Sequence, residues 1–241
     1  AAIRTMVLHS PKEVYPGPYI YRRFWFRDAA FILNALLCVG LKERVVRALD
    51  CFRSRQTAQG YFLSQDGEWD SNGEALWIMR QYCEMTGHVP PEEWKESIEK
   101  GGRWIYKKLL SSEMKSGHAG LLPAGFSAEH LGPNDYYYWD DFWAVAGLKA
   151  AAFLCKDPRF EVQAEQLLKC VDRTLEKTAQ RLKRAAKRQP SGRNRCRPPR
   201  PLPPLSGSLT ARFTWVLSWC SGEPMKPLHI TASCSANSGR M

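Results

Sequence analysis

Asp140 and Asp141 are adjacent acids in a stretch that is otherwise aromatic, residues 136–143. Aromatic neighbours restrict the access of water, which raises the pKa of a carboxylic acid and suits it to donate a proton near neutral pH. A general acid that cleaves a glycosidic bond needs this property. The pair predicts a catalytic acid, either Asp141 or Asp140, with Tyr138 and Trp139 as substrate-binding neighbours. The simpler alternative is that one aspartate caps a helix and the rings belong to the core.

A second candidate lies in the stretch Trp25-Phe26-Arg27-Asp28. An arginine beside an aspartate can donate and accept hydrogen bonds at neighbouring sugar hydroxyls, and a tryptophan face can cover the apolar side of the ring. We therefore predict Trp25, Arg27 and Asp28 to bind substrate. The alternative is that Asp28 caps the following helix and Arg27 is a solvated neighbour.

A third candidate is the pair Trp69 and Asp70, which Ser71 and Asn72 follow. Aspartate, serine and asparagine all favour the N-cap position, so a purely structural role is a strong alternative. The position of the pair favours function, because it enters a helix just as Trp25 and its neighbours enter theirs. Trp69 and Asp70 are therefore predicted to bind substrate as well.

Small and aliphatic residues at helical spacing follow each of the three stretches, which predicts an all-α chain of helical hairpins. The expected helices cover residues 28–38, 41–57, 72–86, a segment from 90–91 onward, 141–155 and 157–183. If the first helices of the hairpins start side by side, carboxylates, one arginine and aromatic faces converge into a sugar site. The long loop 111–138 is expected to be functional or disordered, and it carries two weaker candidate acids, Glu129 and Asp135.

The domain organisation follows from changes in composition. Residues 1–20 contain three prolines and a glycine and are expected to be an irregular lead-in. Residues 21–183 form the helical domain, and residues 184–241 form an Arg/Pro/Ser-rich tail without periodicity. The tail is either a disordered basic arm or the product of a shifted reading frame. The break inside an amphipathic helix, away from any turn signal, favours the second explanation.

The net charge of +11 is concentrated in the tail. From Arg184 onward there are ten basic residues and one acid, which leaves 25 basic and 23 acidic residues, or +2, before it. The charge therefore says little about the helical domain, and a nucleic-acid partner ranks last. No apolar run approaches the roughly 20 residues of a membrane helix, and no signal-peptide layout begins the chain, so a cytoplasmic protein without a membrane partner is expected.

The eight cysteines have no paired short spacing, and the five histidines are scattered. These spacings argue against a zinc site or a disulfide framework. We expect no metal and no cofactor.

Three motifs together resemble the glucoamylase-like glycoside hydrolases, which are six-hairpin (α/α)6-toroid enzymes. They are Trp-x-Arg-Asp at 25–28, Asp-x-x-Gly-x-Ala-Leu at 70–76 and Trp-acid-acid at 139–141, and the resemblance covers about residues 19–177. It implies that Arg27 and Asp28 bind the sugar at its non-reducing end and that an acid at 140 or 141 protonates the leaving oxygen. The glucoamylase-like relative carries glutamates at the positions of Asp140 and Asp141.

The resemblance also implies that half of the ring is absent. Such a toroid needs twelve helices and places its catalytic base in the last hairpin, whereas about six helices precede the tail here. We therefore expect a fragment of a glycoside hydrolase that acts on a glucoside-type carbohydrate but has little or no activity alone. The exposed edge of a half-toroid would favour self-association. The alternative function is a non-catalytic carbohydrate-binding or scaffold protein, and helical toroids also host phosphorylases, lyases and isoprenoid chemistry.

Overall fold

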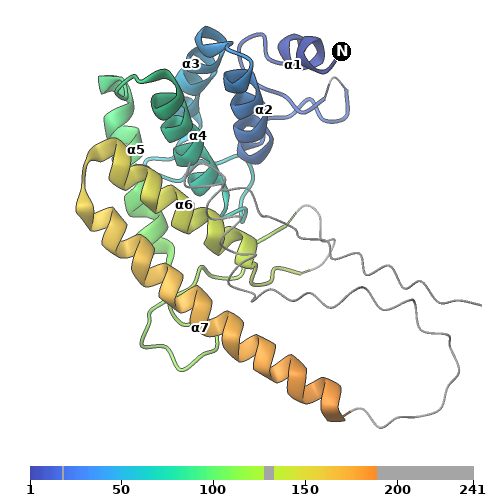
Figure 1. Ribbon diagram of the computed structural model, residues 1–241, viewed down its shortest axis with the longest axis vertical. Helices are drawn as coiled ribbons and strands as arrows, with labels where there is room; N and C mark the ends of the chain where they lie inside the picture. The colour runs from blue at the N-terminus through green and yellow to red at the C-terminus, as the bar shows by residue number, and fades with distance from the viewer. Residues whose placement is uncertain (18, 128–132, 189–241) are drawn as a thin grey trace, which may run out of the picture. The chain divides into compact units, whose positions relative to one another are not determined.

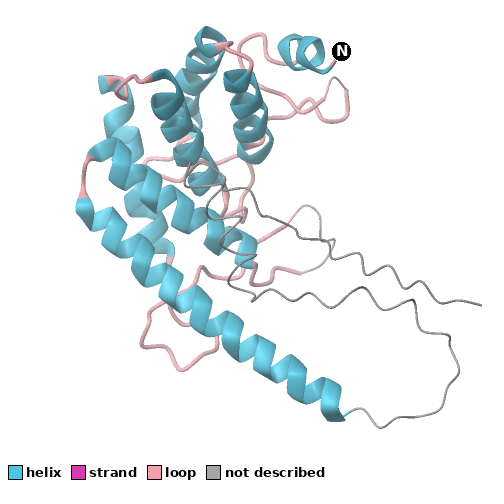
Figure 2. Cartoon of the chain, in the orientation of Figure 1, coloured by secondary structure: helices cyan, strands magenta, loops and turns pink. Residues whose placement is uncertain are grey.

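The computed structural model describes residues 1–17, 19–127 and 133–188. They all belong to the first of two units into which the chain divides, Ala1–Leu205. In this part the chain is all-α, as predicted, and contains no strand (Figure 2). The elements are α1 (Ala2–Leu8), α2 (Phe26–Cys38), α3 (Lys42–Asp50), a 3-10 helix η1 (Cys51–Arg55), α4 (Ser71–Thr86), α5 (Glu92–Lys108), α6 (Tyr138–Cys155) and α7 (Pro158–Arg188).

The helices form the three predicted hairpins, α2 with α3, α4 with α5, and α6 with α7. Helix α4 packs on both α2 and α6, so the first helices of the hairpins are neighbours (Figure 1). Each second helix packs against the first helix of its own hairpin, and α5 also packs against α6. This arrangement brings the N-termini of α2, α4 and α6 toward one another. Closure of such hairpins into a toroid remains a prediction.

The crossing of α4 and α6 depends on two glycines. A Cβ atom added to Gly73 would lie 2.0 Å from the carbonyl oxygen of Trp143, and one added to Gly147 would lie 2.6 Å from the Cα of Gly73. The two backbones therefore touch, and no side chain fits between them. Next to the crossing, the rings of Trp77 and Trp143 meet edge to face at 5.5 Å. Helix α4 is buried over most of its circumference, as expected for a central helix.

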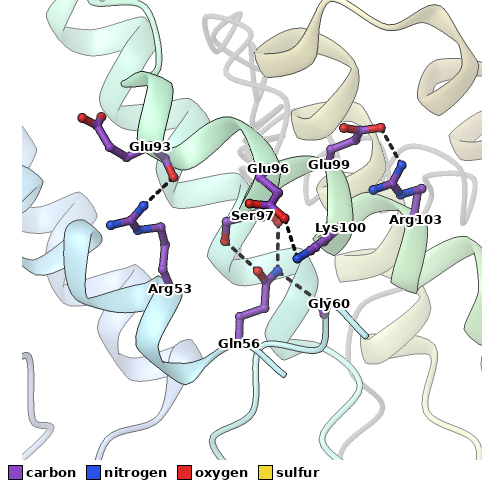
Figure 3. Close-up of polar contacts among 9 residues, drawn as sticks. All are labelled: Arg53, Gln56, Gly60, Glu93, Glu96, Ser97, Glu99, Lys100 and Arg103. Atoms are coloured by element: carbon purple, nitrogen blue, oxygen red, sulfur yellow. Dashed lines mark hydrogen bonds and ion pairs between the residues drawn. The ribbon is translucent and has the colours of Figure 1, made fainter. Parts of the chain in front are cut away.

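The loop that leads from η1 to α4 is held by the side-chain amides of Gln56 and Asn72. Gln56 Nε2 donates to the carbonyl oxygens of Ser97 at 2.9 Å and Gly60 at 3.2 Å, and Ser97 Oγ donates to Gln56 Oε1 at 2.8 Å (Figure 3). Asn72 Oδ1 accepts a hydrogen bond from the Phe62 N–H at 2.8 Å, and its Nδ2 donates to the carbonyl oxygen of Gly60 at 2.9 Å. These contacts fix the segment that carries Trp69 and Asp70 into the site.

Two predictions about the helices were wrong. The lead-in, residues 1–20, is not irregular throughout, because α1 forms over Ala2–Leu8, where neither glycine nor proline interrupts the chain, and ends before Pro11. The predicted helix 41–57 ends as an α-helix at Asp50 and continues as η1. Ser54 Oγ donates to the Cys51 carbonyl oxygen at 2.7 Å within this tighter turn, and such side-chain bonds compete with α-helical ones.

Helix α7 continues past the predicted domain boundary at residue 183. It is helical as far as Arg188, the last described residue, since residues 184–188 contain no glycine or proline to interrupt it. The remaining tail, up to residue 241, lies outside the described residues, and both explanations of it remain predictions.

Candidate active site

A cavity of about 340 Å³ opens where the first turns of α2 and α6 meet the start of α4. Its volume falls within the range of roughly 300–1,000 Å³ that is typical of small-molecule sites. The residues that line it are Arg27, Glu68, Asp70, Phe126, Ser127, Tyr137, Trp139 and Asp140. The structure therefore brings together four of the predicted site residues, one from α2, one from the start of α4 and two from α6.

Three of the lining residues are acids that are almost fully buried. The exposed fractions of Glu68, Asp70 and Asp140 are only 6%, 5% and 5%. Burial, followed by the negative charges of Asp70, Asp141 and Glu68, raises the pKa of Asp140 to about 9. Burial also raises the pKa of Asp70, although a hydrogen bond from Trp139 and the positive charge of Arg27 oppose the shift. Burial therefore favours the protonated form of both acids, and at Asp70 the Trp139 indole and the Arg27 guanidinium oppose it.

The two adjacent aspartates occupy different environments. Asp141 Oδ1 accepts a hydrogen bond from the Leu122 N–H at 2.9 Å, and Asp141 does not line the cavity. Burial raises its pKa to about 7, while the bond from Leu122 opposes that shift. Asp140 lines the cavity, and its buried Oδ2 has no hydrogen-bond partner among the described residues. Asp140 is therefore the aspartate available to a ligand, and Asp141 holds the loop that contains Leu122 against α6.

Asp70 and Trp139 join α4 to α6 across the cavity. Trp139 Nε1–H donates to Asp70 Oδ2 at 2.8 Å, and 43% of the Trp139 surface stays exposed. The Trp139 ring also meets Trp143 edge to face at 5.9 Å, which fixes the orientation of the indole. An exposed aromatic face held in this way can cover the apolar side of a sugar ring.

None of the three predicted stretches uses its acid as a helix cap. The N-cap residues of α2, α4 and α6 are Trp25, Asp70 and Tyr137, and none makes a side-chain capping hydrogen bond. Asp28 lies inside the first turn of α2, and Asp140 and Asp141 lie inside the first turn of α6. The capping alternative therefore fails for all three stretches. The helix dipole still favours acids at these positions.

The far wall of the cavity comes from the loop after α5. The Phe126 N–H donates to the Gly67 carbonyl oxygen at 2.8 Å, and Gly125 and Asp135 exchange backbone hydrogen bonds of 2.8 and 3.1 Å. Gly67 has a φ of +90°, a conformation that glycine adopts without strain, so the chain can turn toward Phe126. These bonds place Phe126 and Ser127 against the cavity.

Four predicted substrate-binding residues do not line the cavity, and two of them, Trp25 and Asp28, lie at the start of α2. Trp25 is half-buried beneath the guanidinium group of Arg23, whose central carbon lies 5.2 Å from the ring centroid. Asp28 lies 4.0 Å from the guanidinium Nε of Arg27. Its position suits it to orient Arg27 and not to contact a ligand in this cavity.

The other two residues outside the cavity turn toward neighbouring helices. Trp69 Nε1–H donates to the Ala124 carbonyl oxygen at 3.2 Å, and the ammonium group of Lys108 lies 3.8 Å from the Trp69 ring centroid. The Tyr138 hydroxyl lies 3.5 Å from Thr178 Oγ1 on α7. Consecutive residues at a helix start point in different directions, so Trp69 and Tyr138 leave the cavity while Asp70 and Trp139 face it.

Sequence reasoning did not predict Glu68, Tyr137, Phe126 or Ser127 as site residues. Glu68 and Tyr137 belong to the aromatic and acidic stretches, so adjacency to Trp69 and Tyr138 was a usable signal. No local pattern marks Phe126 or Ser127. Of the weaker candidate acids, Asp135 is exposed and does not line the cavity, and Glu129 lies outside the described residues.

The described part of the chain contains no group of three or more His, Cys, Asp or Glu residues that could hold a metal ion. Within the same limits, no helix has both the length and the apolar character needed to cross a membrane. Five cysteines in this part are free thiols: Cys38, Cys51, Cys83, Cys155 and Cys170.

No protein-family model, no curated protein and no solved structure matches the chain. The assignment to glucoamylase-like glycosidases therefore remains a prediction from three motifs. The function proposed below is therefore argued from the geometry of the cavity.

Proposed function

We propose that the cavity binds a glucoside-type carbohydrate and that Asp140 is the general acid of a glycoside hydrolase of which this chain is a part. The observation that carries the proposal is the placement of Asp140, a buried acid that lines a small-molecule-sized cavity and whose Oδ2 has no partner in the described chain. Burial and the neighbouring negative charges raise its pKa to about 9. A carboxylic acid that stays protonated at neutral pH can donate a proton to a leaving oxygen.

The neighbouring side chains suit a sugar. The exposed Trp139 face would cover the apolar side of the ring, and Arg27 and Asp70 would donate and accept hydrogen bonds at its hydroxyls. Asp140 would then transfer its proton to the glycosidic oxygen as the bond to the anomeric carbon breaks. A water activated by a second carboxylate completes an inverting reaction, and we propose that this base belongs to the absent half of a toroid. The cytoplasmic location and self-association through the exposed edge of the helices are further parts of the proposal.

Calorimetric titration with glucose and with methyl glucosides of both anomers tests the binding step. We expect Arg27→Ala to weaken binding at least tenfold. Arg22→Ala is the matched control, because this exposed arginine does not line the cavity. Equal affinities for both variants and the unmodified chain would contradict a sugar site at this cavity.

Hydrolysis assays test the acid. We expect the chain alone to turn over neither methyl nor 4-nitrophenyl glucosides. Turnover that Asp140→Asn abolishes would support the acid and refute the expected inactivity. Sugar binding that survives loss of both Asp140 and Asp141 but not of Arg27, without turnover in any preparation, would favour the non-catalytic carbohydrate-binding protein.

A further inference from the structure

Helix α4 carries a second buried acid one turn after Asp70. Glu74 is 0% exposed, and no N–H or O–H donor in the described chain bonds to either of its carboxyl oxygens. The Glu74 N–H donates to the Asp70 carbonyl oxygen at 3.1 Å, so Glu74 follows Asp70 by one helical turn. Residues four apart on a helix lie on the same face, which makes the two carboxyl groups neighbours. Two carboxyl groups can share a hydrogen bond only when one of them carries a proton.

The surroundings decide which carboxyl group carries that proton. Asp70 accepts the indole N–H of Trp139 at 2.8 Å and lies in the field of Arg27, and both contacts favour its ionised form. Glu74 is more deeply buried, and the charges of Asp70 and Glu68 oppose its ionisation. Burial is the largest cause that raises the pKa of Glu74 well above its ordinary value of 4.5, and only Arg27 opposes it. The proton therefore belongs on Glu74.

We propose that Glu74 is a positioning residue of the site. Its carboxyl group remains uncharged at neutral pH and donates a hydrogen bond to the carboxyl group of Asp70 from the buried side of the helix. This bond fills one acceptor position of Asp70, while the Trp139 indole fills another. Together they fix the direction in which the Asp70 carboxylate faces the cavity. The inference rests on the proposed function only in taking Asp70 and Trp139 as sugar-binding groups, and the proton on Glu74 can be tested without any sugar.

A proton on Glu74 in the folded chain should make the stability of the chain fall as the pH rises. A carboxyl group whose pKa is raised in the folded state takes up a proton on folding. Its contribution to the free energy of unfolding therefore falls as the pH rises from the pKa of the unfolded chain toward the pKa of the folded chain. Glutamine at this position takes up no proton and can still donate to Asp70. The folding equilibrium constant of Glu74→Gln, relative to that of the unmodified chain, should therefore rise tenfold per pH unit above about pH 4.5.

Urea unfolding of the full chain between pH 5 and pH 8 measures this ratio. Glu84→Gln is the matched control, because Glu84 lies on the same helix but is partly exposed and paired with Arg80 at 2.8 Å. The control ratio should not rise with pH. A Glu74→Gln ratio that is constant or falls with pH would overturn the proposal, because it would mean that Glu74 is ionised in the folded chain.

A second measurement covers the case in which Glu74→Gln does not fold. Carbon-13 NMR of the unmodified chain labelled at its glutamate carboxyl groups should show one carboxyl that stays protonated through pH 7. A spectrum in which every glutamate titrates near its ordinary pKa would overturn the inference. The Trp139 indole N–H resonance should persist in Glu74→Gln and shift in Glu74→Ala, and an unchanged resonance in both would refute the link through Asp70. If the proton is found but no sugar binds, the proposed function fails and the assignment of the proton stands.

Discussion

Replacement of Asp140 by asparagine should make the protein more stable while removing the proposed acid. Asp140 has a pKa of about 9 in the folded chain, against an ordinary value of 3.8. At any pH between these values the unfolded chain carries an aspartate anion that must take up a proton on folding. Stability attributable to this group is therefore complete below about pH 4 and is lost progressively toward pH 9. Asparagine has a similar shape and takes up no proton.

The magnitude follows from the width of this pH window. Each pH unit corresponds to about 1.4 kcal/mol, and about three units separate the ordinary pKa from pH 7, which gives an upper limit of about 4 kcal/mol. The amide NH2 group of asparagine needs hydrogen-bond partners in the same buried position, and this requirement offsets part of the gain. We therefore expect Asp140→Asn to gain about 2 to 4 kcal/mol in the free energy of unfolding at pH 7, and almost nothing near pH 4.

Urea unfolding at pH 4, 5.5, 7 and 8.5 measures the effect, provided that the unfolding is two-state. Glu113→Gln is a suitable control, because it removes one acid from an exposed loop position outside the cavity. A variant that is equally stable or less stable than the unmodified chain at pH 7 would refute the reasoning. So would a gain that does not change with pH, since only the uptake of a proton produces the predicted slope.

Three further predictions concern the elements that hold the site. Gly73→Ala should destabilise the chain by about 3 kcal/mol in urea unfolding, because its Cβ would overlap the Trp143 carbonyl oxygen, whereas Gly117→Ala, with no atom within 4 Å, should have little effect. Asn72→Ala should cost about 3 kcal/mol in the same assay, since buried backbone partners lose their hydrogen bonds. Trp139→Phe should cost about 2 kcal/mol at pH 7 and weaken calorimetric glucose binding, because Asp70 loses its indole donor. Unchanged unfolding curves, or unchanged glucose affinity for Trp139→Phe, would contradict them.

Local patterns in the sequence predicted the helices and the convergence of their first turns. Arg27, Asp70 and Asp140 each stand at the start of a helix, and hairpins of similar length place such starts at one end. Residue types and helical period are sufficient for this inference, because they depend on neighbours within a few turns.

The facing direction of each side chain could not be predicted in the same way. Trp69 and Asp70 are consecutive, yet Asp70 lines the cavity while Trp69 lies against Ala124 and Lys108. This difference depends on how α4 is rotated about its axis, which its packing on α2 and α6 determines. Phe126 reaches the cavity through a backbone hydrogen bond to Gly67, a contact between residues far apart in the sequence. No local pattern encodes either constraint.

The depth at which the acids are buried links the stability of the site to its proposed chemistry. Burial raises the pKa of both Asp140 and Glu74, and a carboxyl group that takes up a proton on folding lowers the stability of the chain at neutral pH. A hydrophobic residue at either position would avoid this cost, so stability alone does not account for these two acids. Asp140 faces the cavity, whereas Glu74 lies one turn after Asp70 inside the helix packing. In the two proposals made above, the proton of Asp140 is placed where a ligand can receive it and that of Glu74 where it can orient a neighbour, which is the division of roles expected of an acid site built on rigid helices.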